Sequence, residues 1–356
     1  MTILSFVAGL GIIGNVLSLC VLLSPRMPRS STYIYMATLS VTDSLVQVTN
    51  ILFLVSKFPG HEVMVKGTCG LIFFLLYFSL HSNVVVMITM TAERYLAIRF
   101  PLKAMRWFTA RRAKQAVAGV LLLTLLLNAH HLVIRRMTWN DYLKEDTCTL
   151  TGSSQQIHTY GLVWPWIDGS IYCFIPFISL VVFNVLIVKH MRQSRKFRWS
   201  NTRQSSDHST RQGDPNRQIT MMLLMVTCAF LVLVGPVATM LLVERYLWIR
   251  TSPREKAVYH LVRTILNNLS YTNHAINFLL YCLSGNRFRQ EFIQLFCTRS
   301  SCRSSREEQQ QRRENSLNAD RTSPLVSLTH SLTSYTFTDQ SVPSLNGGTP
   351  GTFSHI

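Results

Sequence analysis

Long apolar runs separated by short polar segments account for most of the first 284 residues. Each of the seven runs is long enough to cross a hydrocarbon core of about 30 Å as a helix. Only helices and closed barrels satisfy their backbone groups in lipid, and these runs lack the alternation typical of barrel strands. The pattern therefore predicts an all-α membrane protein, a seven-transmembrane helix bundle. The predicted spans are residues 2–23, 33–56, 69–95, 113–134, 160–189, 218–244 and 257–283.

The pattern changes after the last run. Over residues 285–297 the apolar positions share one helical face, which is typical of a short amphipathic eighth helix at the membrane surface. From residue 298 the chain is rich in Ser, Thr and Gln, which favours a disordered tail. We therefore predict a membrane domain (1–284), an interfacial helix (285–297) and a disordered tail (298–356). The apolar face of the short helix consists of Phe288, Phe292, Leu295 and Phe296.

Composition and charge fit this organisation. The chain is 48% hydrophobic and 15% charged, and its net charge is +18. A basic chain can bind nucleic acid or anionic lipid, but here the charge lies between apolar spans, so membrane lipids are expected partners and nucleic acid is not. The loops after spans one, three and five carry 17 Lys and Arg, against nine in the loops after spans two, four and six. The positive-inside rule then places the N-terminus outside and the short eighth helix in the cytoplasm.

Charged residues at one end of the third span carry the most specific signal. Glu93, Arg94 and Tyr95 end a run that begins at Cys69, and a second cysteine, Cys148, lies in a polar loop predicted to face the same side as Cys69. Ionisable groups at membrane depth are functional candidates. The combination resembles the third helix of rhodopsin-like (class A) G-protein-coupled receptors. The resemblance covers about residues 1–297 and implies a Cys69–Cys148 disulfide.

The same resemblance implies an activation switch. In the family the arginine is held by its neighbouring acid at rest and released toward a heterotrimeric G protein. Three positions depart from the family pattern: Val234 replaces a tryptophan, Phe278 replaces a proline, and Asn216 replaces a second restraining acid. The residues that match the switch are Glu93, Arg94, Tyr95, Phe230, Pro236, Asn277 and Tyr281.

Polar residues inside the spans form a second candidate site. A buried carboxylate must be paired or protonated. In the family the acid matching Asp43 helps to hold an allosteric sodium ion, although Asn83 stands where a serine is usual. The alternative is a structural polar network without an ion, and no other cofactor or metal is expected. The candidate residues are Asn15, Asp43, Asn83, Asn273 and Asn277.

The ligand is expected at the outer end of the bundle. Leu76 and Tyr271 stand where amine receptors carry an aspartate and opsins carry a lysine, so both classes are disfavoured. The end of span seven resembles invertebrate neuropeptide receptors of the FMRFamide and myosuppressin type, and acids around the mouth would suit a basic, amidated peptide. For Asp168 an internal pair or a solvated rim is the alternative. The candidate ligand residues are Tyr77, His81, Asp168, Glu244, Arg263 and Asn267.

These features together predict a multi-pass plasma-membrane receptor for a neuropeptide, and not an enzyme. A chemosensory receptor for a small molecule, a non-signalling decoy and a transporter are the alternatives. Cys297 and Cys302 beside the amphipathic helix are palmitoylation candidates. Serines and threonines of the tail are expected to be sites for receptor kinases and contacts for arrestin.

Overall fold

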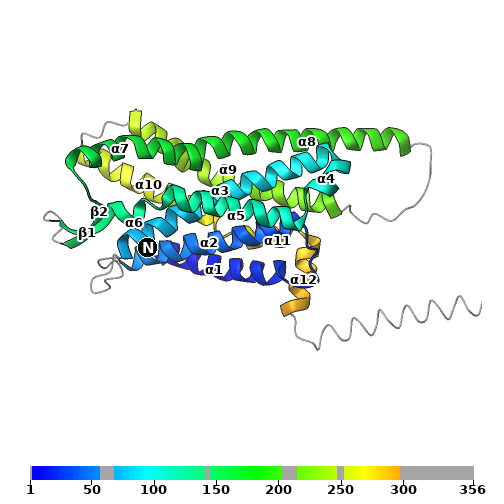
Figure 1. Cartoon of the computed structure of the whole chain (residues 1–356), viewed down its shortest axis with the longest axis horizontal. Helices are drawn as coiled ribbons and strands as arrows, with labels where there is room; N and C mark the ends of the chain where they lie inside the picture. The colour runs from blue at the N-terminus through cyan, green and yellow to red at the C-terminus, as the bar shows by residue number, and fades with distance from the viewer. Residues whose placement is uncertain (1, 57–67, 141–144, 203–214, 247–251, 297–356) are drawn as a thin grey trace, which may run out of the picture. The chain divides into compact units, whose positions relative to one another are not determined.

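Long helices lie side by side along most of the chain, as the computed structural model shows (Figure 1). It describes residues 2–56, 68–140, 145–202, 215–246 and 252–296. The predicted tail and both candidate palmitoylation sites, Cys297 and Cys302, lie outside the described residues. The elements are α1 Thr2–Leu22, α2 Ser31–Val55, α3 Thr68–Arg99, α4 Pro101–Trp107, α5 Ala110–Asn128, α6 His131–Ile134, β1 Arg135–Asn140, β2 Glu145–Leu150, α7 Ser154–Gly169, η1 Ser170–Phe174, α8 Ile175–Thr202, α9 Pro215–Tyr246, α10 Pro253–Asn273, α11 Asn277–Ser284 and α12 Asn286–Phe296.

The seven-helix membrane bundle is confirmed. Within the described residues, six helical stretches are long and apolar enough to cross a membrane by themselves. The seventh crossing, α10 with α11, is more polar because its first turns carry charged side chains and its lower part carries buried amides. Of these amides, Asn277 donates to Asp43 inside the bundle, and polar groups that face the bundle interior are tolerated in a membrane helix.

Three crossings are not regular helices. The fourth turns between α5 and α6, and the seventh is interrupted at residues 274–276, between α10 and α11. In the fifth, η1 is a π-helical turn that ends two residues before Pro176. Proline lacks a backbone N–H and crowds the preceding turn, so a wider turn at this point accommodates it.

A β-hairpin lies at one end of the bundle, near the N-terminus of α1 (Figure 1). We call this the hairpin end, and the opposite end, where α4 and α12 lie, the α12 end. The strands β1 and β2 pair antiparallel with Met137 opposite Cys148. Cys148 is bonded to Cys69 in the first turn of α3, with their Cα atoms 5.8 Å apart. The disulfide that the family resemblance implied is therefore present, whereas the hairpin was predicted only as a polar loop.

The short helix α12 fulfils the amphipathic prediction with one correction. Phe288 is buried and Phe292 half-buried against the ring of Phe278. Glu291, a charged residue that does not belong to the predicted apolar face, is buried as well. The reason is a polar partner: the hydroxyl of Ser24 donates to its carboxylate at 2.5 Å. Residues after the first helix thus anchor α12.

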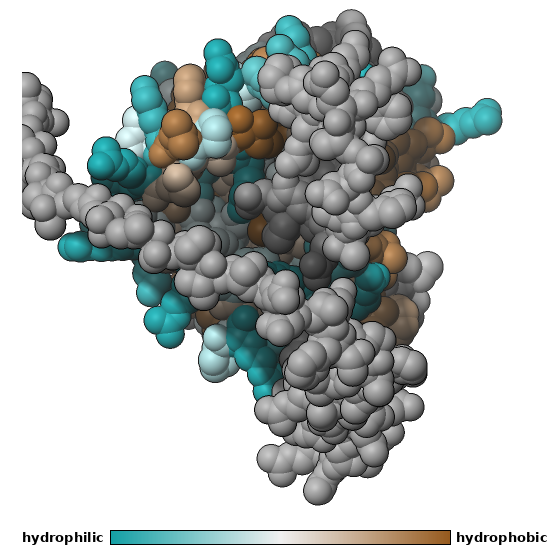
Figure 2. Space-filling model, turned by 90° about the vertical axis from the view of Figure 1, so that its right-hand side faces the viewer, coloured by the Kyte–Doolittle hydropathy of each residue, from teal (hydrophilic) through white to brown (hydrophobic). Residues whose placement is uncertain are grey.

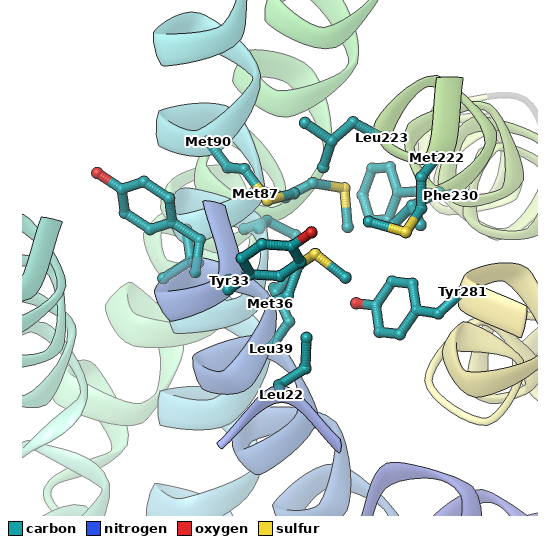
Figure 3. Close-up of a cluster of buried hydrophobic side chains, with 14 of the residues drawn as sticks. Leu22, Tyr33, Met36, Leu39, Met87, Met90, Met222, Leu223, Phe230 and Tyr281 are labelled. Atoms are coloured by element: carbon teal, nitrogen blue, oxygen red, sulfur yellow. The ribbon is translucent and has the colours of Figure 1, made fainter. Parts of the chain in front are cut away.

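The bundle has an apolar core and an apolar outer surface. Figure 3 shows the core at its α12 end, where methionines and leucines gather around Tyr33 and Tyr281. Many apolar side chains on the outer faces of the helices are exposed, as expected of a bundle whose surface meets lipid. Examples are Leu122, Leu123 and Leu126 of α5, and Val181, Val182 and Val185 of α8.

Candidate functional site

A buried carboxylate lies at the centre of the bundle. Asp43 of α2 has no exposed side-chain surface, and three N–H donors from other elements point at it. Asn83 of α3 donates to Oδ1 at 2.6 Å, and Asn277 of α11 donates to Oδ2 at 2.6 Å. The third donor is Nδ1 of His274, 2.7 Å from Oδ1. Burial without such partners would be prohibitive for a carboxylate.

The sequence identified most, but not all, of this pocket. Asn15 takes part indirectly, because its amide donates to the backbone oxygen of His274 at 2.9 Å. Asn273 is buried nearby, but its Nδ2 has no hydrogen-bond partner among the described residues. The residue that sequence reasoning missed is His274. The sequence feature that could have identified His274 is its position inside an apolar span, three residues before Asn277 and so on the same helix face.

Arg94 lies at the α12 end of α3, half-buried. The family resemblance pairs it with Glu93, but both side chains bind helix α2 instead. The guanidinium of Arg94 donates to the hydroxyl of Thr32. Glu93 accepts hydrogen bonds from Ser31 and, at 3.0 Å, from Tyr35. Tyr95 turns toward α8, where its ring lies 5.9 Å from that of Phe183. Arg94 is therefore held by a hydroxyl, a partner that it can exchange without breaking an ion pair.

Near the α12 end, the described residues leave an open space of about 1110 Å³ between α8 and α9, lined by residues that include Lys189, Arg192 and Met225. A small cavity of about 20 Å³ is lined by residues of α2, α9, α12 and the turn before α12, including Tyr33, Met222 and Phe288. A cavity of this size holds at most one water molecule. Tyr281 is fully buried beside it, with its ring 5.5 Å from that of Phe288. Figure 2 views this end and shows hydrophilic residues over much of its described surface.

The aromatic and proline positions of the predicted switch fill the core around α9. Phe230 is fully buried and packs against Phe177 of α8, with ring centroids 5.7 Å apart. Pro236 lies inside α9, six residues beyond Phe230. At the position where the family has proline, Phe278 packs on α12 and lies against Gly14 of α1. This replacement therefore adds a contact between α1, α11 and α12.

A histidine–carboxylate pair lies nearer the hairpin end. His81 of α3 is fully buried, and its two ring nitrogens bind two other helices. Nδ1 is 3.1 Å from Oδ1 of Asn128, and Nε2 is 3.0 Å from Oδ1 of Asp168. The side chain of Asp168 is 27% exposed. The internal pair that the sequence left open for Asp168 is thus present, with part of the carboxylate still accessible.

The other predicted ligand residues are spread around this pair. Tyr77 stacks on the ring of His131, with centroids 4.5 Å apart. Arg263 is exposed on α10 and donates to the hydroxyl of Tyr259 at 2.7 Å, while Asn267, one turn further along, is half-buried. The side chain of Glu244 lies outside the described residues. The structure therefore brings Tyr77, His81 and Asp168 together and leaves Arg263 and Asn267 on a separate helix.

Comparison with known proteins agrees with this architecture. Residues 14–281 match the family described as "7 transmembrane receptor (rhodopsin family)". The chain is also similar to a probable G-protein coupled receptor of Caenorhabditis elegans, with 25% identity over 305 residues. That alignment covers 83% of this chain and 68% of the nematode protein.

Proposed function

Because the chain belongs to the rhodopsin family of seven-transmembrane receptors, we propose that it binds an extracellular neuropeptide and activates a heterotrimeric G protein. In this proposal it spans the plasma membrane with the hairpin end and the N-terminus outside. The α12 end then faces the cytoplasm, as the distribution of Lys and Arg between the loops favours.

The observation that carries the proposal is the arrangement along α3. This single helix of 32 residues, about 48 Å long, carries functional groups near both ends. Its first turn is bonded to the hairpin through Cys69, and two to three turns further along lie Tyr77 and His81. Arg94 lies near its other end. A ligand at one end of α3 and a partner at the other can therefore act on one rigid element.

The coupling follows from two states of the bundle. A ligand shifts their equilibrium only by binding one state more tightly than the other. In the closed state of this proposal, Arg94 is held by Thr32, as it is in the structure. In the open state, α9 swings outward about Pro236, Arg94 leaves Thr32, and a cleft forms for the G protein.

Features of the hairpin end support a peptide as the ligand. The accessible part of the Asp168 carboxylate can pair with an arginine of the peptide in a charge-assisted contact. Trp139 of the hairpin is 59% exposed and offers an aromatic surface. The complete burial of His81 favours the second candidate, a small-molecule chemosensory receptor with an enclosed site.

Ligand-stimulated nucleotide exchange tests the proposal. Membranes from cells that express the full-length chain would be mixed with purified G proteins and a panel of amidated peptides. We expect a saturable response to a peptide that contains a basic residue. Asp168→Asn should reduce the potency of that peptide about ten-fold, which corresponds to about 1.4 kcal/mol. The matched control is Asp146→Asn in β2, an exposed acid of the hairpin whose loss should leave potency unchanged.

The outcomes separate the alternatives. A response to small molecules and to no peptide would replace the neuropeptide with a chemosensory ligand. High-affinity peptide binding without nucleotide exchange by any G protein would instead identify a non-signalling decoy.

A further inference from the structure

The Asp43 pocket differs from a cation site in the groups that surround its carboxylate. A sodium ion, like other hard cations, is bound by oxygen atoms. Here the three groups nearest the carboxylate are the nitrogen donors of Asn83, Asn277 and His274. Their N–H bonds direct positive ends toward the place that a cation would need.

The Asp43 carboxylate also has few free lone-pair sites left with which to bind a cation. An ionised carboxylate offers about four lone-pair sites, and three are taken by these donors. Oδ1 accepts from both Asn83 and His274 at 2.6 and 2.7 Å. A hard cation in contact with Oδ1 would have to come within about 2.3–2.6 Å of that oxygen. The imidazole ring occupies one of the two approaches that Oδ1 offers.

The remaining polar atoms of the pocket suit water better than a cation. Five side-chain atoms around Asp43 are buried without a hydrogen-bond partner among the described residues. The set is mixed: it includes an N–H donor, two amide oxygens, a ring nitrogen and a hydroxyl. Water can donate to some of them and accept from others, whereas a cation would leave the N–H donor unsatisfied. The atoms are Nδ2 of Asn273, Oδ1 of Asn15 and of Asn83, Nε2 of His274 and the hydroxyl of Tyr281.

We infer that the imidazole of His274 takes the place of the sodium ion against Asp43, and that this pocket is a hydrated hydrogen-bond network that binds no cation. The backbone reinforces the position of the ring. Asn15 of α1 binds the carbonyl oxygen of His274, and the chain between α10 and α11 turns at this residue. Asp43 therefore holds the ring and Asn15 holds the backbone of the same residue, and sodium would have to displace the ring.

Thermal unfolding of the purified full-length receptor in lipid nanodiscs tests this inference. Its Tm would be measured in increasing NaCl and in N-methylglucamine chloride at equal ionic strength. We expect the two salts to give the same Tm for the unaltered receptor. His274→Ser removes the ring and adds a hydroxyl oxygen, so sodium should now raise Tm saturably by a few degrees.

Two further variants test whether the sodium response depends on the side chain at position 274 and on the carboxylate of Asp43. His274→Gln keeps an N–H donor near Asp43 and should stay insensitive to sodium. Asp43→Asn, added to His274→Ser, should abolish the sodium response. The inference is overturned if the unaltered receptor shows a saturable, sodium-specific rise in Tm that Asp43→Asn removes. This comparison does not require any His274 variant to fold. It is also overturned if His274→Ser folds and does not respond to sodium.

Discussion

Arg94 keeps its positive charge at any pH that the protein meets, so its partner, and not its protonation, decides where it points. In the structure that partner is the hydroxyl of Thr32. The carboxylate of Glu93, the adjacent residue, is occupied by Ser31 and Tyr35 of the same helix α2. Holding the guanidinium with a neutral hydroxyl costs less to undo than breaking a buried ion pair. The closed state is therefore restrained lightly at this point.

Thr32→Val should raise ligand-independent activity. Valine has nearly the same shape but cannot accept the hydrogen bond from Arg94, and a hydrogen bond to a charged group contributes about 1.5–3 kcal/mol. Losing part of that contribution in the closed state alone should increase basal nucleotide exchange several-fold. The measurement is exchange by the G protein that couples to the receptor, without ligand and at matched receptor density.

Thr38→Val is the control for this substitution. Thr38 lies on the same helix and is half-buried, but its hydroxyl donates only to the backbone oxygen of Ile34, one turn away. Basal exchange should not change in Thr38→Val. Equal basal exchange in both variants would show that Thr32 does not restrain Arg94.

Periodicity in the sequence was enough to predict the crossings, because an apolar run of about 20 residues has few other stable arrangements. It could not predict the break between α10 and α11, since residues 257–283 read as one continuous helix. Nor could it predict the hairpin. β1 and β2 show little apolar alternation, and their register is fixed by pairing with each other and by the bond from Cys148 to Cys69.

For the candidate sites too, the local sequence pattern predicts some features, and contacts between distant segments decide the others. Family matching assigned Asp43, Asn83 and Asn277 to one polar network, and the structure brings their side chains together. Family matching also included Asn273 and left out the next residue, His274. Neighbouring side chains on a helix point about 100° apart, so only one of the two can face the same partner. The pairing of His81 with Asp168 joins two helices far apart in sequence, and no local pattern contains that information.

Close packing of α1 on the seventh crossing depends on a glycine. A Cβ at Gly11 would lie 2.9 Å from the Cβ of Ala275 and 3.0 Å from its Cα, so a backbone would have to move. Gly11→Ala should therefore destabilise the receptor by about 1–3 kcal/mol, the usual cost of overpacking. Small residues at such contacts allow membrane helices to approach closely.

Gly9→Ala tests the same helix without the clash. A Cβ at Gly9 meets nothing within 4 Å, and alanine favours a helix more than glycine does, so stability should be unchanged or slightly higher. Thermal unfolding of both variants in nanodiscs makes the comparison. If Gly11→Ala were as stable as Gly9→Ala, the two helices would not need their close contact.

The disulfide joins the hairpin to the helix that links the two ends of the molecule. Cys69 and Cys148 are 79 residues apart in sequence, so their bond closes a large loop that includes α4, α5 and α6. In the chain-entropy description, closing a loop of this size stabilises the folded state by about 4 kcal/mol. The bond also fixes the hairpin over the residues that we propose to contact the ligand.

Cys69→Ala with Cys148→Ala should therefore lower Tm by about 10 °C, taking about 2–4 °C for each kcal/mol in a domain of this size. It should also weaken ligand binding, because the hairpin loses its attachment to α3.

The matched control is Cys20→Ala with Cys228→Ala, which removes two exposed, unpaired cysteines and should leave Tm unchanged. Both double variants lose two sulfurs, so only the covalent link separates them. Equal Tm values, measured under non-reducing conditions, would mean that the hairpin and α3 are held together by packing and hydrogen bonds alone. In that case ligand affinity, and not stability, would be the property that the disulfide serves.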